Sequence, residues 1–192
     1  MLEKLCQAER QIVKNEILFW ADRKWTVHAL TVMPDHAHVL ATPLEASPGR
    51  WFPLSEIVRS TKAGSALTIN RGRGSKGALW QSESFDRIIR DDREFHEKEG
   101  YVIENAVRAG LVEDPWQWDG LWHPSMGDSR VRPRPAQGSE DESRRAGPRP
   151  AQSTSPGSQG IPMDELIIKR RRRLPHWQLA GSTYFVTFRL KA

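Results

Sequence analysis

The chain contains the segment Trp25-Thr-Val-His-Ala-Leu-Thr-Val-Met-Pro-Asp-His-Ala-His-Val-Leu-Ala-Thr42. Two runs rich in β-branched and apolar residues stand on either side of its Pro-Asp pair. Such runs are typical of strands, and Pro-Asp is typical of a turn. The segment therefore predicts a β-hairpin of residues 25–32 and 36–42.

Helical and strand patterns alternate on both sides of this hairpin. Apolar residues recur at helical spacing from about Leu2 to Trp20, which predicts an amphipathic helix. The remaining pattern predicts a helix over 54–69, a glycine-rich loop over 71–77, a strand over 78–90 and a helix over 92–109. Residues 1–125 are thus expected to form one α+β domain.

The pattern stops after this domain and returns near the C-terminus. Residues 126–162 are dominated by Pro, Arg, Gly and Ser, which predicts a flexible linker. The last segment, 163–192, contains Ser182-Thr-Tyr-Phe-Val-Thr-Phe-Arg-Leu190, a run that is apolar on both faces. Such a strand is typical of a sheet interior, so we expect it to fold back onto the first domain, and pairing of residues 182–190 beside residues 25–32 of the same chain would settle the order of the segments.

Charge is distributed unevenly along the chain. Residues 1–125 carry 16 Lys and Arg against 18 Asp and Glu, whereas the remaining residues carry 13 against 6. A basic, Arg-rich tail indicates either a solvated segment or one that binds phosphate. Cys6 is the only cysteine, and no membrane helix or secretion signal is visible, so we expect a cytoplasmic location.

Two groups of residues carry chemistry. His36 and His38 project from the same face of their strand, where two imidazoles can converge on a divalent ion. Taken alone, a His-x-His pair is more often an ordinary pair of surface or hydrogen-bonded histidines. Tyr101 lies beside the apolar stripe Phe95, Val102, Ala106 and Ala109 of the predicted helix, with Asn105 one turn later. A tyrosine there is usually a packing residue, but it also suits a nucleophile with an amide neighbour.

Four spaced blocks of the chain resemble the HUH endonuclease superfamily. The first is Val32-Met-Pro-Asp-His-Ala-His-Val-Leu40, which is similar to its His-hydrophobic-His signature. The later blocks, Leu79-Trp-Gln81, Ser84-Phe-Asp-Arg-Ile-Ile-Arg90 and Tyr101-Val-Ile-Glu-Asn-Ala-Val-Arg-Ala-Gly-Leu-Val112, resemble the branch of REP-associated tyrosine transposases. The resemblance covers nearly all of residues 1–125.

The resemblance implies a ferredoxin-like antiparallel sheet with helices on one face. It implies Mg²⁺ or Mn²⁺ held by His36, His38 and Asn105, and Tyr101 as the nucleophile that becomes joined to the 5′ end of cut DNA. The implied partner is single-stranded or hairpin DNA of palindromic repeats, with no membrane partner, and the implied location of the chain is the cytoplasm in association with the nucleoid. A catalytically impaired or domesticated hairpin-binding protein of the same fold is the alternative.

The C-terminal segment resembles the beginning of these transposases, the first strand of the fold. The chain is therefore interpreted as a circular permutant whose residues 1–125 lack that strand, and Tyr184 as a sheet residue. A rival account is a truncated tandem copy, which could donate the strand to a neighbour. A monomer and a strand-swapped homodimer both stay open.

Contacts to DNA are expected from basic clusters. The candidates are Arg59 and Lys62 on one helix face, Arg71, Arg73 and Lys76 in the glycine-rich loop, and the run Arg170, Arg171, Arg172 and Arg173. Each cluster is about as often solvated surface as a phosphate contact, and the arginine run is favoured because the first domain is slightly acidic.

Overall fold

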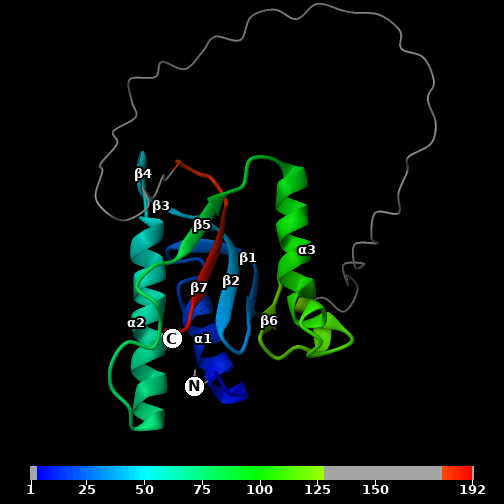
Figure 1. Cartoon of the computed structure of the whole chain (residues 1–192). Coiled ribbons are helices and arrows are strands. Elements are labelled where there is room, and N and C mark those ends of the chain that lie inside the picture. Colours follow the sequence, from blue (N-terminus) through cyan, green and yellow to red (C-terminus); the bar gives the residue numbers. More distant parts are fainter. Residues whose placement is uncertain (1–3, 128–178, 192) are drawn as a thin grey trace, which may run out of the picture. The chain divides into compact units, whose positions relative to one another are not determined.

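The computed structural model describes residues 4–127 and 179–191 (Figure 1). These residues form a five-stranded antiparallel sheet, three α-helices and a small two-stranded sheet, which confirms the predicted α+β class. In chain order the elements are α1 (Gln7–Phe19), β1 (Trp25–Val32), β2 (His36–Pro43), β3 (Glu45–Ser47), β4 (Arg50–Trp51), α2 (Leu54–Arg73), β5 (Phe85–Ile88), α3 (Asp92–Arg108), the 3-10 turns η1 (Pro115–Gln117) and η2 (Pro124–Gly127) on either side of β6 (Leu121–Trp122), and β7 (Tyr184–Arg189).

The predicted hairpin is present as β1 and β2. Its register runs from Trp25 opposite Pro43 to Val32 opposite Ala37, and a bulge interrupts it after Val27. The turn closes where the Met33 amide donates to the His36 carbonyl at 2.7 Å. This tight closure fixes the start of β2, the strand that carries both histidines.

The C-terminal strand β7 lies inside the sheet, between β5 and β2. It pairs with β2 from Tyr184 opposite Ala41 to Arg189 opposite His36, which confirms Tyr184 as a sheet residue. The strand does not pair with residues 25–32. The other edge of β1 is taken by β6, so the open edge of the hairpin belongs to β2, and local sequence does not reveal which edge of a hairpin is open.

The strand order is β5-β7-β2-β1-β6. If β7 is counted first, the elements follow the pattern β-α-β-β-α-β and its four strands lie in the order fourth, first, third, second. This is the ferredoxin-like arrangement. Strand β6 extends it beyond β1.

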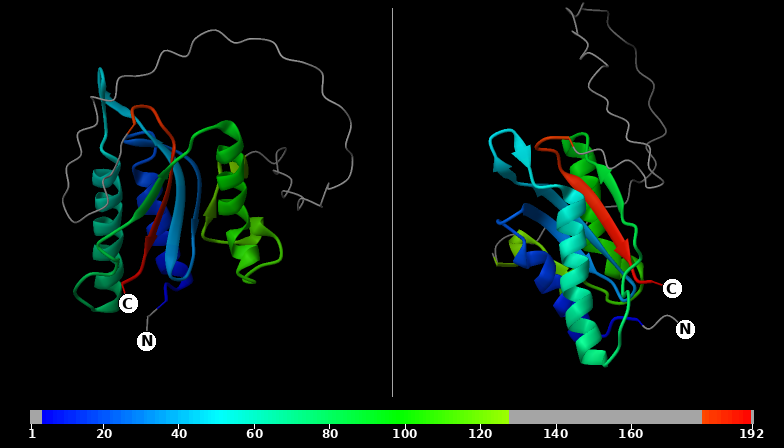
Figure 2. Two further views of the ribbon diagram at one scale, coloured as in Figure 1. Left: turned by 45° about the horizontal axis from the view of Figure 1, so that its top comes forward. Right: turned by 90° about the vertical axis from the view of Figure 1, so that its left-hand side faces the viewer.

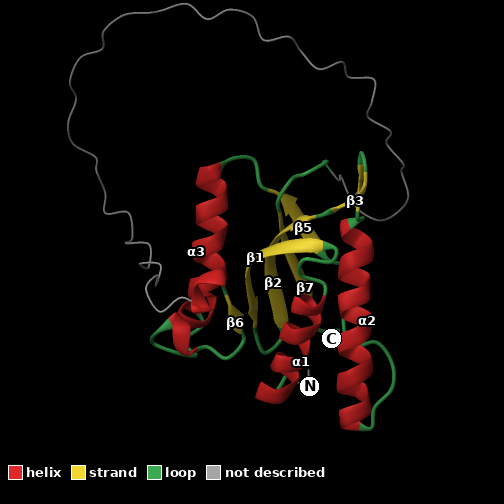
Figure 3. Cartoon of the chain, turned by 180° about the vertical axis from the view of Figure 1, so that it is seen from behind, coloured by secondary structure: helices red, strands yellow, loops and turns green. Residues whose placement is uncertain are grey.

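Helices cover both faces of this sheet. Helices α1 and α2 pack on the face formed by alternate residues such as Val39 and Val186, whereas α3 covers the face formed by Leu40 and Phe185 (Figures 1 and 3). The expectation of helices on one face therefore holds for α1 and α2 but is wrong for α3. An apolar stripe predicts that a helix packs on a sheet but does not tell which face it covers.

Two predicted boundaries also differ. Helix α2 continues through Arg73 and ends at Gly74, which has the left-handed φ of 63° that suits glycine, so the glycine-rich loop is shorter than expected. The strand predicted over 78–90 is only β5 and an isolated bridge from Trp80 to Leu190.

The two ends of the described domain meet at the hairpin turn (Figure 2). The Leu5 amide donates to the Pro34 carbonyl at 2.7 Å, and the Leu190 amide donates to the Asp35 carbonyl at 2.9 Å. The predicted linker, 126–162, lies almost entirely outside the described residues. No helix of the described part is long and apolar enough to cross a membrane.

Candidate active site

The two histidines lie side by side on the α3 face of β2. Their ring centroids are 4.7 Å apart and their planes are nearly perpendicular. Ala37 between them points to the opposite face and is fully buried there, as the alternation of a strand requires. The sequence prediction that both imidazoles share a face is thus confirmed.

Each histidine uses Nδ1 for a hydrogen bond within the protein. His36 Nδ1 lies 2.6 Å from Asp35 Oδ1, and His38 Nδ1 lies 2.7 Å from Thr187 Oγ1 on β7. The Nε2 atom of His38 is buried and has no hydrogen-bond partner among the described residues. When Nδ1 carries the proton, it donates to Thr187 and leaves the Nε2 lone pair unused. A buried polar atom without a partner is costly, and a bound group would remove that cost.

The site favours neutral imidazole at position 38. Burial, reinforced by the positive charges of His36 and Arg189, lowers the pKa of His38 to about 3. Burial raises the pKa of Asp35, but the hydrogen bond from His36 and the positive charges of His36 and Arg189 outweigh it, and the net pKa is lowered. At pH 7 the site therefore presents a neutral His38 and a carboxylate at Asp35, so a lone pair is available for a cation.

Tyr101 of α3 packs edge to face against His38. Its ring centroid is 5.2 Å from that of His38 and 5.9 Å from that of Phe185. Tyr101 is only partly buried, so solvent reaches its side chain. The first turn of α3 is stabilised by the Asp91 side chain, which accepts from the Glu94 amide at 2.7 Å and caps the helix. The ring of Tyr101 is therefore presented to His38 from a capped helix.

Asn105 is buried on the same helix, one turn after Tyr101, and is 7% exposed. Val102 belongs to the buried cluster of Ala29, whereas Ala106 belongs to that of Met33. Asn105 therefore lies on the turn of α3 between the levels of Ala29 and Met33, and Thr31, which is between them in the sequence, pairs with His38. The side-chain amide of Asn105 forms no hydrogen bond to another described residue.

These residues fit a divalent ion. The orphaned Nε2 of His38, its neighbour His36 and the side-chain amide of Asn105 offer N and O donors, and each histidine is oriented by a hydrogen bond at Nδ1, as is usual for metal ligands. Within residues 4–127 and 179–191, no group of three or more His, Cys, Asp or Glu side chains could hold a metal. Any third ligand therefore has to be of another type, such as an amide.

The predicted DNA contacts lie away from this site. Helix α2, which carries Arg59, Lys62, Arg71 and Arg73, packs on the opposite face of the sheet from His38. Lys62 Nζ donates to the Ser82 and Glu83 carbonyls at 3.1 and 3.3 Å, and burial lowers its pKa. Arg73 pairs with Glu9. Arg59 and Arg71 are exposed, and the run 170–173 lies outside the described residues.

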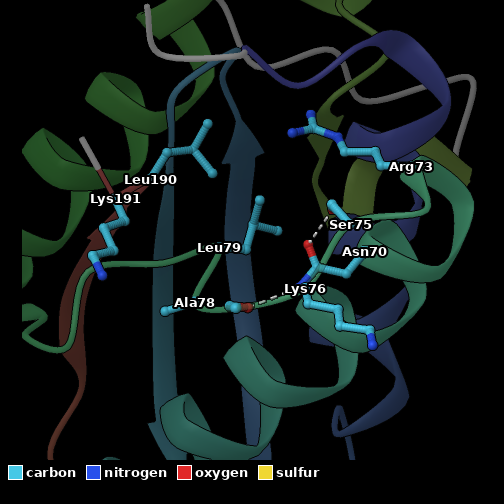
Figure 4. Close-up of a pocket in the computed structure, with 9 residues that line it drawn as sticks. Asn70, Arg73, Ser75, Lys76, Ala78, Leu79, Leu190 and Lys191 are labelled. Carbon is cyan, nitrogen blue, oxygen red and sulfur yellow. Dashed lines mark hydrogen bonds between the residues drawn. The ribbon is translucent and has the colours of Figure 1, made fainter.

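Lys76 lines a pocket of about 190 Å³ between the end of α2 and the end of β7 (Figure 4). The Asn70 and Ser75 side chains of this pocket are already engaged. Asn70 Nδ2 donates to the Gly77 carbonyl at 2.8 Å, and Ser75 Oγ donates to Asn70 Oδ1 at 3.1 Å. These hydrogen bonds stabilise the loop after α2. The pocket is therefore a consequence of how this loop folds.

Sequence reasoning missed three residues of β7 that face the histidines. Phe185 stacks on His38 with ring centroids 5.2 Å apart, Thr187 bonds His38, and Arg189 lies opposite His36. Because side chains alternate along a strand, the sequence alone shows that these three residues share a face. Their position beside β2 depends on a register set across the whole domain.

Comparison with known proteins supports the fold. No family model and no curated protein matches the chain. One solved structure is similar, described as a REP-associated tyrosine transposase bound to a REP hairpin, with a TM-score of 0.54 and 21% sequence identity over 71% of this chain and 78% of that one. At this identity, the likeness shows a shared fold.

Proposed function

We propose that this chain is a metal-dependent transposase of the single-tyrosine HUH type, which nicks and rejoins single-stranded DNA next to a hairpin. The observation that carries the proposal is the buried, unpartnered Nε2 of His38, which lies beside His36 and beneath the ring of Tyr101. An acid-base pair or a packing cluster does not need an orphaned nitrogen at this point. A metal site beside a nucleophile does.

The proposed reaction is transfer of a phosphoryl group to Tyr101. The phenolic oxygen attacks phosphorus, the bond from phosphorus to the 3′ oxygen breaks, and the phenolic proton is passed through solvent to the leaving 3′ oxygen. The 5′ end is then joined to the tyrosine. Attack by a 3′ hydroxyl on this phosphotyrosine reverses the step and rejoins DNA, so no external energy source is required.

His36, His38 and Asn105 are the proposed ligands of Mg²⁺ or Mn²⁺. When bound, the ion supplies positive charge that polarises the scissile phosphate. Asp35 and Thr187 keep Nδ1 of each histidine occupied, so that Nε2 is directed away from the strand. None of the three ligands carries a negative charge, so the positive charge of the ion is preserved.

Hairpin DNA is the proposed substrate class, and two findings support it. The fold is shared with a transposase whose solved structure contains a REP hairpin. The chain as a whole carries a formal charge of +5, which favours a polyanionic partner.

The test is formation of a covalent adduct. The full chain is incubated with Mn²⁺ and a labelled single-stranded oligonucleotide that contains a hairpin, and the products are separated under denaturing conditions. The chain has two tyrosines, which provides a matched control. We expect an adduct with the wild type and with Tyr184→Phe, and none with Tyr101→Phe.

Hairpin binding without any adduct in the wild type would refute nicking and favour the alternative, a hairpin-binding protein of the same fold. An adduct that survives in Tyr101→Phe would assign the nucleophile elsewhere. Removal of the metal with EDTA should abolish the adduct while DNA binding persists.

We also propose that the chain is a circular permutant. The ferredoxin-like strand order with β7 counted first supports this, as do Leu5 and Leu190, which donate to the adjacent carbonyls of Pro34 and Asp35. A short peptide from residue 191 to residue 4 restores the unpermuted order. A rearranged chain with residues 179–191 placed before 4–127 should fold as a monomer and form the same adduct. A full chain that elutes as a dimer with exchanged β7 strands would favour the rival account.

A further inference from the structure

Arg189 occupies a special position beside the histidine pair. It is the direct antiparallel partner of His36, and such partners have Cβ atoms about 4.5–5.5 Å apart. Alternation along β7 places it on the same face as Phe185 and Thr187, both of which contact His38. Its charge is close enough to lower the pKa of both Asp35 and His38. Arg189 is therefore the cation that β7 brings to the site.

The Arg189 guanidinium has no hydrogen-bond or ion-pair partner among residues 4–127 and 179–191, and the side chain is exposed. Two other cations near Tyr101 are already engaged. Lys98 Nζ pairs with Glu97 at 3.0 Å, and Arg108 Nη2 pairs with Glu104 at 2.9 Å. A cation that the fold holds on a strand yet leaves unpaired is available for a ligand.

We propose that Arg189 binds the DNA phosphate that faces His36, His38 and Tyr101. The inference rests on the proposed function and assigns a substrate contact to the C-terminal strand. Attack on a phosphodiester concentrates negative charge on the non-bridging oxygens. A guanidinium presents a planar fork of donors that matches these oxygens and keeps its charge at any working pH. Preorganised donors of this kind stabilise the developing charge strongly.

The contact is tested first by equilibrium binding of the full chain to a fluorescent hairpin oligonucleotide in EDTA, over a range of KCl concentrations. Each phosphate contact on a single strand contributes about 0.7 to the slope of log affinity against log salt. We expect Arg189→Ala to reduce the slope by about 0.7, Arg189→Lys to retain it, and Arg50→Ala, a change at an exposed arginine of β4, to leave it unchanged. An unaltered slope in Arg189→Ala would overturn the inference.

The position of the contact is tested by the single-turnover rate of adduct formation with Mn²⁺ at saturating DNA. Arg189→Ala should slow this rate about 10²- to 10³-fold, as loss of a preorganised donor does, and Arg189→Lys should recover part of it. A wild-type rate in Arg189→Ala would overturn the placement at the reacting phosphate. A wild type that forms no adduct would refute the proposed function, while the binding measurement in EDTA still decides whether Arg189 touches DNA.

Discussion

His38 Nδ1 lies 2.7 Å from Thr187 Oγ1, although 149 residues of chain separate them. The hydroxyl fixes the imidazole so that its buried Nε2 is the nitrogen left for a ligand. The proposed metal site therefore includes an orienting group from the C-terminal segment as well as the ligands from β2 and α3.

Replacement of Thr187 should weaken metal binding without disturbing the ligands. In Thr187→Val we expect a 10- to 100-fold loss of Mn²⁺ affinity, because His38 is then free to choose another ring orientation or tautomer. Isothermal titration calorimetry with the full chain measures it. Thr183→Val is the control, since Thr183 bonds Thr42 at 2.8 Å and not a histidine. Equal Mn²⁺ affinities of the wild type, Thr187→Val and Thr183→Val would show that Thr187 does not orient His38.

Removal of a buried β7 side chain should destabilise the whole domain. Phe188 is 1% exposed and its ring contacts Trp80 edge to face at 4.9 Å. We expect Phe188→Ala to lower the free energy of unfolding by about 3–5 kcal/mol, as measured by urea denaturation. Leu179→Ala, a change at a side chain that is 63% exposed, should have little effect. If Phe188→Ala unfolds like the wild type, β7 is not part of the cooperative core.

Two glycines should respond in opposite directions to alanine. A Cβ at Gly120 would overlap the Val32 carbonyl oxygen, which belongs to the rigid backbone of β1, whereas a Cβ at Gly100 in α3 would meet nothing within 4 Å. Gly120→Ala should cost about 1–3 kcal/mol through overpacking. Gly100→Ala should gain about 0.5–1 kcal/mol because glycine is a poor helix former. Thermal unfolding distinguishes them, and a stabilised Gly120→Ala would contradict the close approach.

The ion pair of Glu9 and Arg73 should make stability depend on pH. The hydrogen bond from Arg73 lowers the pKa of Glu9 below its ordinary value of 4.5, although burial opposes the shift. A lowered folded-state pKa stabilises the fold above about pH 4.5, and this contribution is lost as the pH falls through the folded-state value. Glu9→Gln should therefore cost about 1 kcal/mol at pH 7 and much less at pH 3, as measured by urea denaturation.

The exposed Glu83 provides the control for this prediction. Glu83→Gln should leave the free energy of unfolding unchanged at both pH values. A penalty for Glu9→Gln that is equally large at pH 3 would mean that lost packing, and not lost charge, is responsible.

Local pattern was sufficient for the hairpin, its two histidines and the strand at 184–189. It was not sufficient for the partners of that strand. Thr187 and Arg189 could be placed on a common face by alternation alone, but only the pairing of β7 with β2 puts them against His38 and His36. Likewise Val102 and Ala106 of the predicted stripe are buried, whereas Ala109 is exposed because the helix ends there. The face that α3 covers is set by packing in three dimensions.

The place of β7 between β5 and β2 has a consequence for synthesis of the protein. A ribosome that has made β5 at Ile88 must still make the long stretch up to Tyr184 before the sheet can close. At roughly 5–20 residues per second, the nascent chain waits on the order of 5–20 seconds with both neighbouring strand edges unpaired. Such edges are ready templates for aggregation. Production of this chain should therefore depend strongly on chaperones that shield the unfinished sheet.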